Sequence, residues 1–186
     1  MHLGKLEPEK VKQNIILSSL YITAYDLLEV EIKENTKTFS TFHLKYSNEP
    51  DWKEKAKQEY KREVTNKYPF KDKLNKVYKD DYRACSLWLK DIGAINLKEV
   101  KTLLKIRTHR NDVVHNLPSF IGDNDKHLNI SLFNELQEIY KKIRIFWIRT
   151  NSLDLNPEFD NVVIKDKDIE ATLFWDYIKH CIEVKI

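Results

Sequence analysis

The sequence predicts an all-α protein, an antiparallel helical bundle of about five to six helices. The chain has 186 residues but only 3 glycines and 5 prolines. All-β folds need many tight turns, and these turns consume glycine and proline. Apolar residues recur at steps of three and four, the period of an amphipathic helix. The length suits one domain with a sizeable core and is short for two, so we expect a single domain over residues 1–186.

In the first half of the chain we expect one long helix followed by shorter ones. Pro8 suits the first turn of a helix, where its missing N–H is no loss. Tyr68-Pro69 disfavours continuing a helix across it. The expected elements are a helix over residues 8–35, a polar loop over 36–50, a Lys/Glu-rich helix over 51–66 and a short helix over 72–79.

The second half carries clearer signals for where helices begin and end. Asp80 or Asp81 can cap a helix that Gly93 stops, and Asn96 with Glu99 forms the pattern of a capping box. Ser131 can cap a later helix. The expected elements are a helix up to residue 92, one over 97–117 that ends at Pro118, a polar loop over 119–129, a long helix from 131 that includes Trp147, and a last helix over 168–184, with residues 161–165 helical or extended.

Composition and charge exclude several classes of protein. No apolar stretch follows Met1 as in a signal peptide, and polar residues interrupt the apolar stretch 15–32, so no membrane span is expected. The two cysteines have no metal-ligand spacing, and a reduced, cytoplasmic protein is the simplest interpretation. Residues 45–149 carry 23 Lys/Arg against 15 Asp/Glu. This basic middle could meet a polyanion such as RNA, but charge alone favours a set of solvated helix faces.

The helix expected over residues 97–117 breaks its own apolar pattern. One seam runs through Leu97, Val100 and Leu104 and then turns polar at Arg107 and Asn111. Arg110 lies on the flank of this seam, and His115 prolongs the stripe. A helix that only fills a core keeps apolar residues on such a face, and an unpaired buried arginine costs several kcal/mol. The pattern therefore indicates either a functional site or cations that complement the dipole at a helix end.

The segment Arg110-Asn111-Asp112-Val113-Val114-His115 resembles the R-x(4–6)-H motif of the HEPN superfamily, in the form with Asn directly after the Arg. In that superfamily the motif lies near the C-terminal end of a helix in an antiparallel bundle. The resemblance covers mainly this helix and the general helical layout.

The resemblance implies a metal-independent endoribonuclease that cleaves RNA through its 2′-hydroxyl. It implies that His115 acts as general acid or base, a role that suits a residue type titrating near neutral pH. It implies that Arg110 holds the scissile phosphate and offsets the charge of the transition state. Asn111 matches the polar residue after the Arg and would orient the site. Asp112, three residues before His115, is within helical reach of the imidazole and could orient it.

Further expectations concern RNA contacts and partners. Arg107, His109 and Asn116 are the candidate RNA-binding residues around the motif. One histidine cannot comfortably serve as both acid and base, and HEPN proteins resemble one another in dimerising around one cleft. We therefore expect a homodimer with the site at its interface. The substrate would be tRNA or mRNA, the biological role that of a toxin or antiphage effector, and an antitoxin or regulatory partner is possible.

One departure from the family concerns its silencing. In HEPN toxins that a nucleotidyltransferase silences, a Tyr follows the His at the second position, where this chain has Leu117. That antitoxin pairing is therefore not expected.

Other kinds of site are poorly supported by the sequence. The histidines form no HxxxH pair, and no Gly-rich phosphate loop is present, so neither a metal nor a cofactor is expected. The four tryptophans fit a core or an interface better than a base-stacking surface. Two rival interpretations stay open: a non-catalytic HEPN-fold module that binds RNA, a nucleotide or a protein, and a helical interaction protein whose motif residues form a structural ion-pair network.

Overall fold

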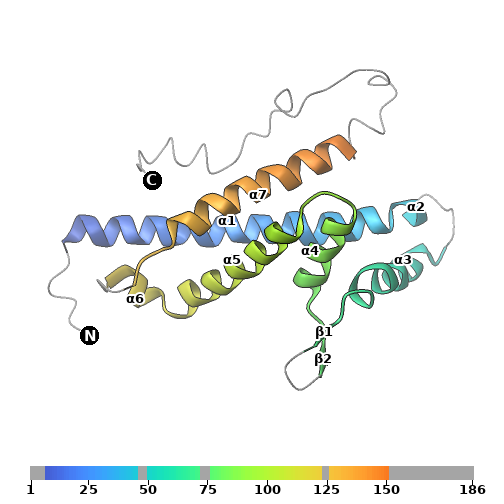
Figure 1. Cartoon of the computed structure of the whole chain (residues 1–186), viewed down its shortest axis with the longest axis horizontal. Coiled ribbons are helices and arrows are strands. Elements are labelled where there is room, and N and C mark those ends of the chain that lie inside the picture. Colours follow the sequence, from blue (N-terminus) through green and yellow to red (C-terminus); the bar gives the residue numbers. More distant parts are fainter. Residues whose placement is uncertain (1–6, 46–49, 72–75, 123–125, 151–186) are drawn as a thin grey trace.

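The computed structural model describes residues 7–45, 50–71, 76–122 and 126–150, and it confirms the all-α helical bundle. In chain order the elements are α1 (Pro8–Ser40), α2 (Phe42–Lys45), α3 (Trp52–Tyr60), the π-helical turn η2 (Lys61–Thr65), β1 (Phe70–Lys71), β2 (Val77–Tyr78), α4 (Asp81–Asp91), α5 (Leu97–His115), α6 (Leu117–Gly122) and α7 (Ile130–Ile148). The long helix α1 is the spine of the bundle, and α4, α5, α6 and α7 all pack against it (Figure 1).

The hydrophobic core lies where α1 meets α4, α5 and α7. Polar anchors reinforce this core, since the Tyr21 hydroxyl donates to the Ile106 carbonyl and the Trp147 indole N–H donates to the Glu31 carbonyl. Among the described residues, fully buried apolar side chains come from all four helices: Tyr21, Leu28, Ile32, Leu89, Leu103, Ile106, Phe133, Leu136 and Ile143.

Local sequence signals set both ends of α4 and the beginning of α5 as expected. The Asp80 carboxylate accepts from the Arg83 backbone N–H and caps α4. Gly93 adopts φ +83°, a left-handed conformation that other residues adopt only with strain, and it ends this segment. Asn96 and Glu99 form the expected capping box at the start of α5. The beginning of the motif-bearing helix is thus encoded within four residues.

Several expected boundaries are wrong. The loop over 36–50 is not a loop throughout, because α1 continues to Ser40 and α2 follows at once. Residues 77–78 are not helical but pair with β1 in a two-stranded antiparallel hairpin. Pro118 does not close off helical structure; it lies in the first turn of α6, a position that its missing N–H permits. Asn129 rather than Ser131 caps α7, and its side chain accepts from the Leu132 backbone N–H.

The expectations for residues 161–165 and 168–184 lie outside the described residues. None of the described helices combines the length and the apolarity that a membrane-spanning segment needs. Cys85 is a free, buried thiol whose pKa is raised to about 11, chiefly by burial.

Candidate functional site

An arginine interrupts the row of buried apolar side chains on α5. Leu103, Ile106 and Val113 are all fully buried, and Arg110 occupies the same row between Ile106 and Val113. The seam expected from the sequence through Leu97 is wrong in register, because Leu97 is 52% exposed. The structure does show a break in the apolar pattern, but the residue at the break is Arg110 rather than Arg107 and Asn111. A helix that served packing alone would carry an apolar side chain at this position.

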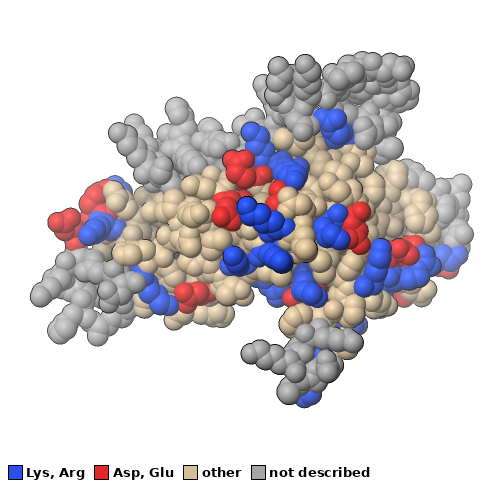
Figure 2. All heavy atoms as spheres, viewed as in Figure 1, with Lys and Arg blue, Asp and Glu red and all other residues tan. Residues whose placement is uncertain are grey.

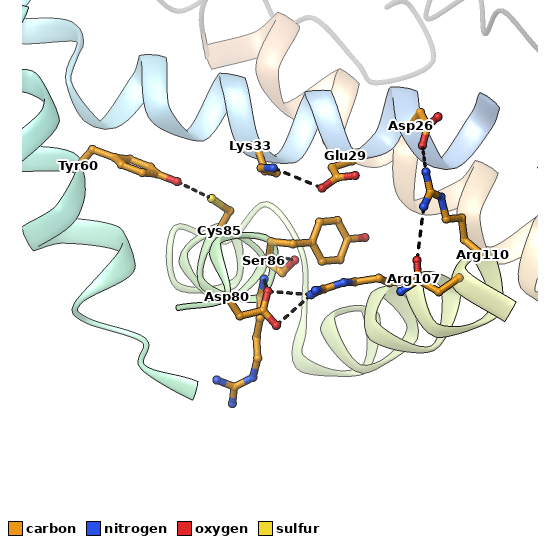
Figure 3. Close-up of polar contacts among 12 residues, drawn as sticks. Asp26, Glu29, Lys33, Tyr60, Asp80, Cys85, Ser86, Arg107 and Arg110 are labelled. Carbon is orange, nitrogen blue, oxygen red and sulfur yellow. Dashed lines mark hydrogen bonds and ion pairs between the residues drawn. The ribbon is translucent and has the colours of Figure 1, made fainter. Parts of the chain in front are cut away.

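Arg110 reaches from α5 to the surface of α1. Its Nη2 donates to the Asp26 carboxylate at 3.0 Å and its Nη1 donates to the Asn111 side-chain oxygen at 3.4 Å. The guanidinium lies over the Tyr25 ring, 5.3 Å from its centroid, and its Nε is buried with no acceptor among the described residues. Figure 3 shows the side chain extending toward Asp26. Arg110 is therefore fixed on one side and keeps further N–H groups for a ligand.

Arg107, three residues earlier, is bound in a parallel way by α4. Its Nη1 donates to both oxygens of Asp80, at 2.7 and 2.9 Å, and its guanidinium lies over the Tyr82 ring. Burial is the largest single influence on the pKa of Arg107 and lowers it, but the hydrogen bonding and charge of Asp80, with smaller contributions from Tyr25 and Glu29, together raise the pKa above its ordinary value. Figure 3 shows this pair beside the Arg110–Asp26 pair. Arg107 therefore ties α5 to α4, a structural role that the sequence did not indicate.

Two tyrosines join the arginines into one cluster. The rings of Tyr25 on α1 and Tyr82 on α4 lie 5.8 Å apart, each carrying one arginine. Burial raises the pKa of both hydroxyls. The Tyr82 hydroxyl is buried and has no hydrogen-bond partner among the described residues. Sequence reasoning missed Tyr25, Asp26 and Tyr82, since their role depends on which helices pack together.

His115 lies at the last position of α5, and its side chain is exposed. No hydrogen bond or ion pair of its imidazole with another described residue is recorded. Five residues separate it from Arg110, which places the two side chains about 140° apart around the helix axis and about 7.5 Å apart along it. The two motif residues therefore do not converge on one point within a subunit. A site that uses both needs a second chain or a ligand that spans the helix.

Asp112 does not orient the imidazole in the way the sequence suggested. Its carboxylate accepts from Lys126 at 3.0 Å and from the Asn116 side-chain amide at 2.7 Å. Hydrogen bonding to Lys126 lowers the pKa of Asp112 below its ordinary value. This carboxylate therefore fastens the end of α5 to the segment before α7. Asn111 and Asn116 are exposed beside it, and Asn111 accepts from Arg110.

The His109 side chain packs against other parts of the bundle. Its ring packs edge-on against Tyr21 and Phe120, and its Nε2 accepts from the backbone N–H of Asn129 at 3.0 Å. Burial lowers the pKa of His109, and the charge of Asp112 opposes this only in part. An accepting nitrogen requires the neutral imidazole. His109 therefore braces the start of α7, a different role from the RNA contact expected from the sequence.

Within the described part of the chain, no three His, Cys, Asp or Glu side chains gather as they would around a metal ion. Comparison of the whole chain with protein-family models, with curated proteins and with solved structures found no significant match.

Proposed function

We propose that this chain is a metal-independent endoribonuclease of HEPN type. The observation that carries the proposal is the position of Arg110. It interrupts the fully buried row of α5, rests on Tyr25 and Asp26, and keeps donors free. Such a fixed cation is suited to a phosphate whose charge grows in the transition state.

In this proposal His115 supplies the proton transfer. Its imidazole is exposed and engaged with no described residue, so it is accessible to a 2′-hydroxyl or a leaving oxygen. The 2′-hydroxyl loses its proton as its oxygen attacks the adjacent phosphorus, the bond between phosphorus and the 5′-oxygen breaks, and that oxygen gains a proton. His115 carries out one of these two proton transfers and water the other, so no proton is gained or lost overall. The products are a 2′,3′-cyclic phosphate and a 5′-hydroxyl. In this proposal no metal is needed, because the nucleophile is the RNA's own 2′-hydroxyl, His115 moves a proton and Arg110 offsets the phosphate charge.

The separation of Arg110 and His115 around α5 gives dimerisation a specific role in this proposal, which is to complete the site. Because Arg110 and His115 of one chain point in different directions, we propose that Arg110 of one subunit works with His115 of the other.

The test is cleavage of total RNA in EDTA by the wild type and two variants. Arg110→Ala and His115→Ala should both abolish cleavage. Arg144→Ala is the matched control for the arginine, since Arg144 also pairs with a carboxylate of α1 from another helix. His43→Ala is the control for the histidine, since His43 is exposed on the distant α2. Cleavage that survives in Arg110→Ala overturns the proposal.

One observation favours a rival, the helical interaction protein whose motif residues form a structural ion-pair network. Both arginines of α5 already have a carboxylate partner, Asp80 for Arg107 and Asp26 for Arg110. Motif variants that fail to fold select this rival. A wild type that binds RNA but never cuts it selects instead the non-catalytic module of the same fold.

The biological role proposed for the nuclease is that of a toxin or antiphage effector that cleaves tRNA or mRNA. Expression of the wild type should then slow growth of the host cell, and either motif substitution should relieve this effect. An antitoxin or another regulatory partner would be the natural means of keeping such activity in check.

A further inference from the structure

The outer face of α5 carries a row of basic side chains that leads to His115. Lys98, Lys101 and Lys105 follow each other at three- and four-residue steps, and all three are exposed. The same face continues through Thr108 to His115, about 21 Å beyond Lys101 along the helix axis. The lysines therefore share a surface with His115, on the side of α5 that faces away from α1.

These lysines are not neutralised by neighbouring carboxylates. No ion pair of Lys98, Lys101 or Lys105 with another described residue is recorded, whereas several lysines elsewhere have carboxylate partners: Lys12, Lys33, Lys55, Lys57, Lys67, Lys90, Lys126 and Lys142. Lys37, Lys53 and Lys61 also have no recorded carboxylate partner in the described part of the chain, but they lie on three different elements rather than on one helix face. Unpaired lysines on one face leave a positive potential that a polyanion can meet without displacing an existing partner.

Helix α7 extends this basic surface. Lys142 donates to both oxygens of Glu99 at 3.0 Å, which joins α7 to the first turn of α5 and neutralises the acid there. Lys141 beside it is exposed and has no recorded partner among the described residues. The run 141–144 is not one basic face, because Arg144 points to Glu31 on α1. Figure 2 shows Lys and Arg side chains gathering over the area of α5 and α7.

Two hollows lie within this surface, and charged and uncharged side chains line each of them. The α7 hollow, of about 350 Å³, is lined by Lys141, Lys142 and Glu138 together with Ile145 and Phe146. The α5 hollow, of about 520 Å³, is lined by Lys105 and Asp112 together with Leu104, Thr108 and His109. Lysines beside apolar and aromatic side chains suit a strand whose phosphates and unstacked bases are both accessible.

We propose that this basic face of α5 and α7, defined by Lys98, Lys101, Lys105 and Lys141, binds single-stranded RNA and leads it toward His115. The inference rests on the proposed ribonuclease function and adds where the substrate lies. Phosphates contact the lysines, and bases enter the two hollows. A duplex fits less well, because its bases are stacked inside and cannot enter the two hollows.

The test measures binding of a short single-stranded 2′-O-methyl RNA, which lacks the free 2′-hydroxyl that cleavage needs. The triple variant Lys98→Gln, Lys101→Gln, Lys105→Gln should weaken binding at least about tenfold and reduce the slope of log K against log salt by about 2, since each phosphate contact contributes about 0.7 on single strands. The matched control is Lys37→Gln, Lys53→Gln, Lys61→Gln, which removes the same charge from exposed sites on α1, α3 and η2.

The control should keep wild-type affinity, and the wild type should prefer the single strand to the duplex of the same sequence. Equal loss in both triple variants, or tighter binding of the duplex, overturns the proposal. Because binding is measured without cleavage, a wild type that binds through this face but never cuts RNA refutes the nuclease and leaves the binding face standing.

Discussion

At the scale of single residues, two buried tyrosines that contact α5 differ in whether their hydroxyl has a hydrogen-bond partner. The Tyr21 hydroxyl donates to the Ile106 carbonyl, while the Tyr82 hydroxyl has no partner among the described residues. A buried hydroxyl without a partner costs about 1–3 kcal/mol, and a satisfied one contributes about 1 kcal/mol. The two residues therefore offer a matched pair with opposite outcomes.

Tyr82→Phe should leave the free energy of unfolding unchanged or raise it by about 1 kcal/mol, because it removes an unsatisfied group. Tyr21→Phe should lower it by about 1 kcal/mol, because it leaves the Ile106 carbonyl without that donor. Urea unfolding of both variants gives the comparison. A clear loss of stability in Tyr82→Phe would show that its hydroxyl has a partner after all.

His109 makes stability depend on pH in a defined direction. Its pKa is lowered in the folded state by burial, so the unfolded chain binds its proton more readily. Stability from this group is then fully present above the unfolded pKa of about 6.5 and is lost as the pH falls below it. Thermal melts between pH 7 and pH 5 should show a falling melting temperature.

The same melts on His109→Gln isolate this contribution. The variant should show a shallower pH dependence over that window, although its stability at pH 7 should be lower than that of the wild type. Carboxylates do not interfere, because those with lowered pKa values, such as Asp112, lose their contribution only below about pH 4. An unchanged slope in the variant would assign the pH dependence to another group.

At the scale of elements, the sequence predicted where helices begin better than which way they face. The capping box at Asn96 and the left-handed Gly93 are local signals, readable over a few residues. Local sequence does not decide which face of α5 is buried, because either of two neighbouring apolar rows could have been the buried one. Packing against α1 selects the row of Leu103 and Ile106. The choice depends on tertiary contacts that no window of sequence contains.

The candidate site also has some features that the sequence predicts and others that depend on tertiary contacts. The position of Arg110 and His115 near the end of α5 follows from the sequence, and so does the break in the apolar pattern. The partners of Arg110 do not, because Asp26 lies 84 positions earlier. The sequence predicts a short helix over residues 72–79, yet residues 77–78 pair with β1. Short elements are the least determined by local propensity.

Asp80 joins two elements with one carboxylate. It caps α4 through the Arg83 N–H and binds Arg107 of α5. Asp80→Ala removes both contacts and should lower the free energy of unfolding by about 2 kcal/mol, of which about 1 comes from the lost cap. Asp80→Asn keeps a capping oxygen and loses only the ion pair, so its loss should be clearly smaller. Equal losses in the two variants, measured by urea unfolding, would mean that the cap contributes nothing.

At the scale of the whole molecule, the arrangement of α5 makes a prediction about mixed dimers. Arg110→Ala and His115→Ala subunits are each inactive alone in the proposed mechanism. If Arg110 of one chain works with His115 of the other, a mixed dimer contains one complete site and one doubly defective site. Co-refolding equal amounts should therefore restore about a quarter of the wild-type activity, since half of the dimers are mixed and each has one of two sites.

Activity that stays absent in the mixture would place both residues of each site in the same chain. A solution mass of one chain would rule out the shared site altogether, and sedimentation measures it independently of activity. Double-variant subunits mixed with either single variant serve as the control, because no pairing of those chains assembles a complete site.

The most direct measurement is the chemistry of the RNA ends. Incubate the wild type in EDTA with a defined single-stranded oligoribonucleotide and determine the product masses by mass spectrometry. We predict fragments that carry a 2′,3′-cyclic phosphate and a 5′-hydroxyl, and none when Arg110→Ala or His115→Ala replaces the wild type. Intact RNA with the wild type, or fragments with 5′-phosphate ends, would contradict the proposed use of Arg110 and His115.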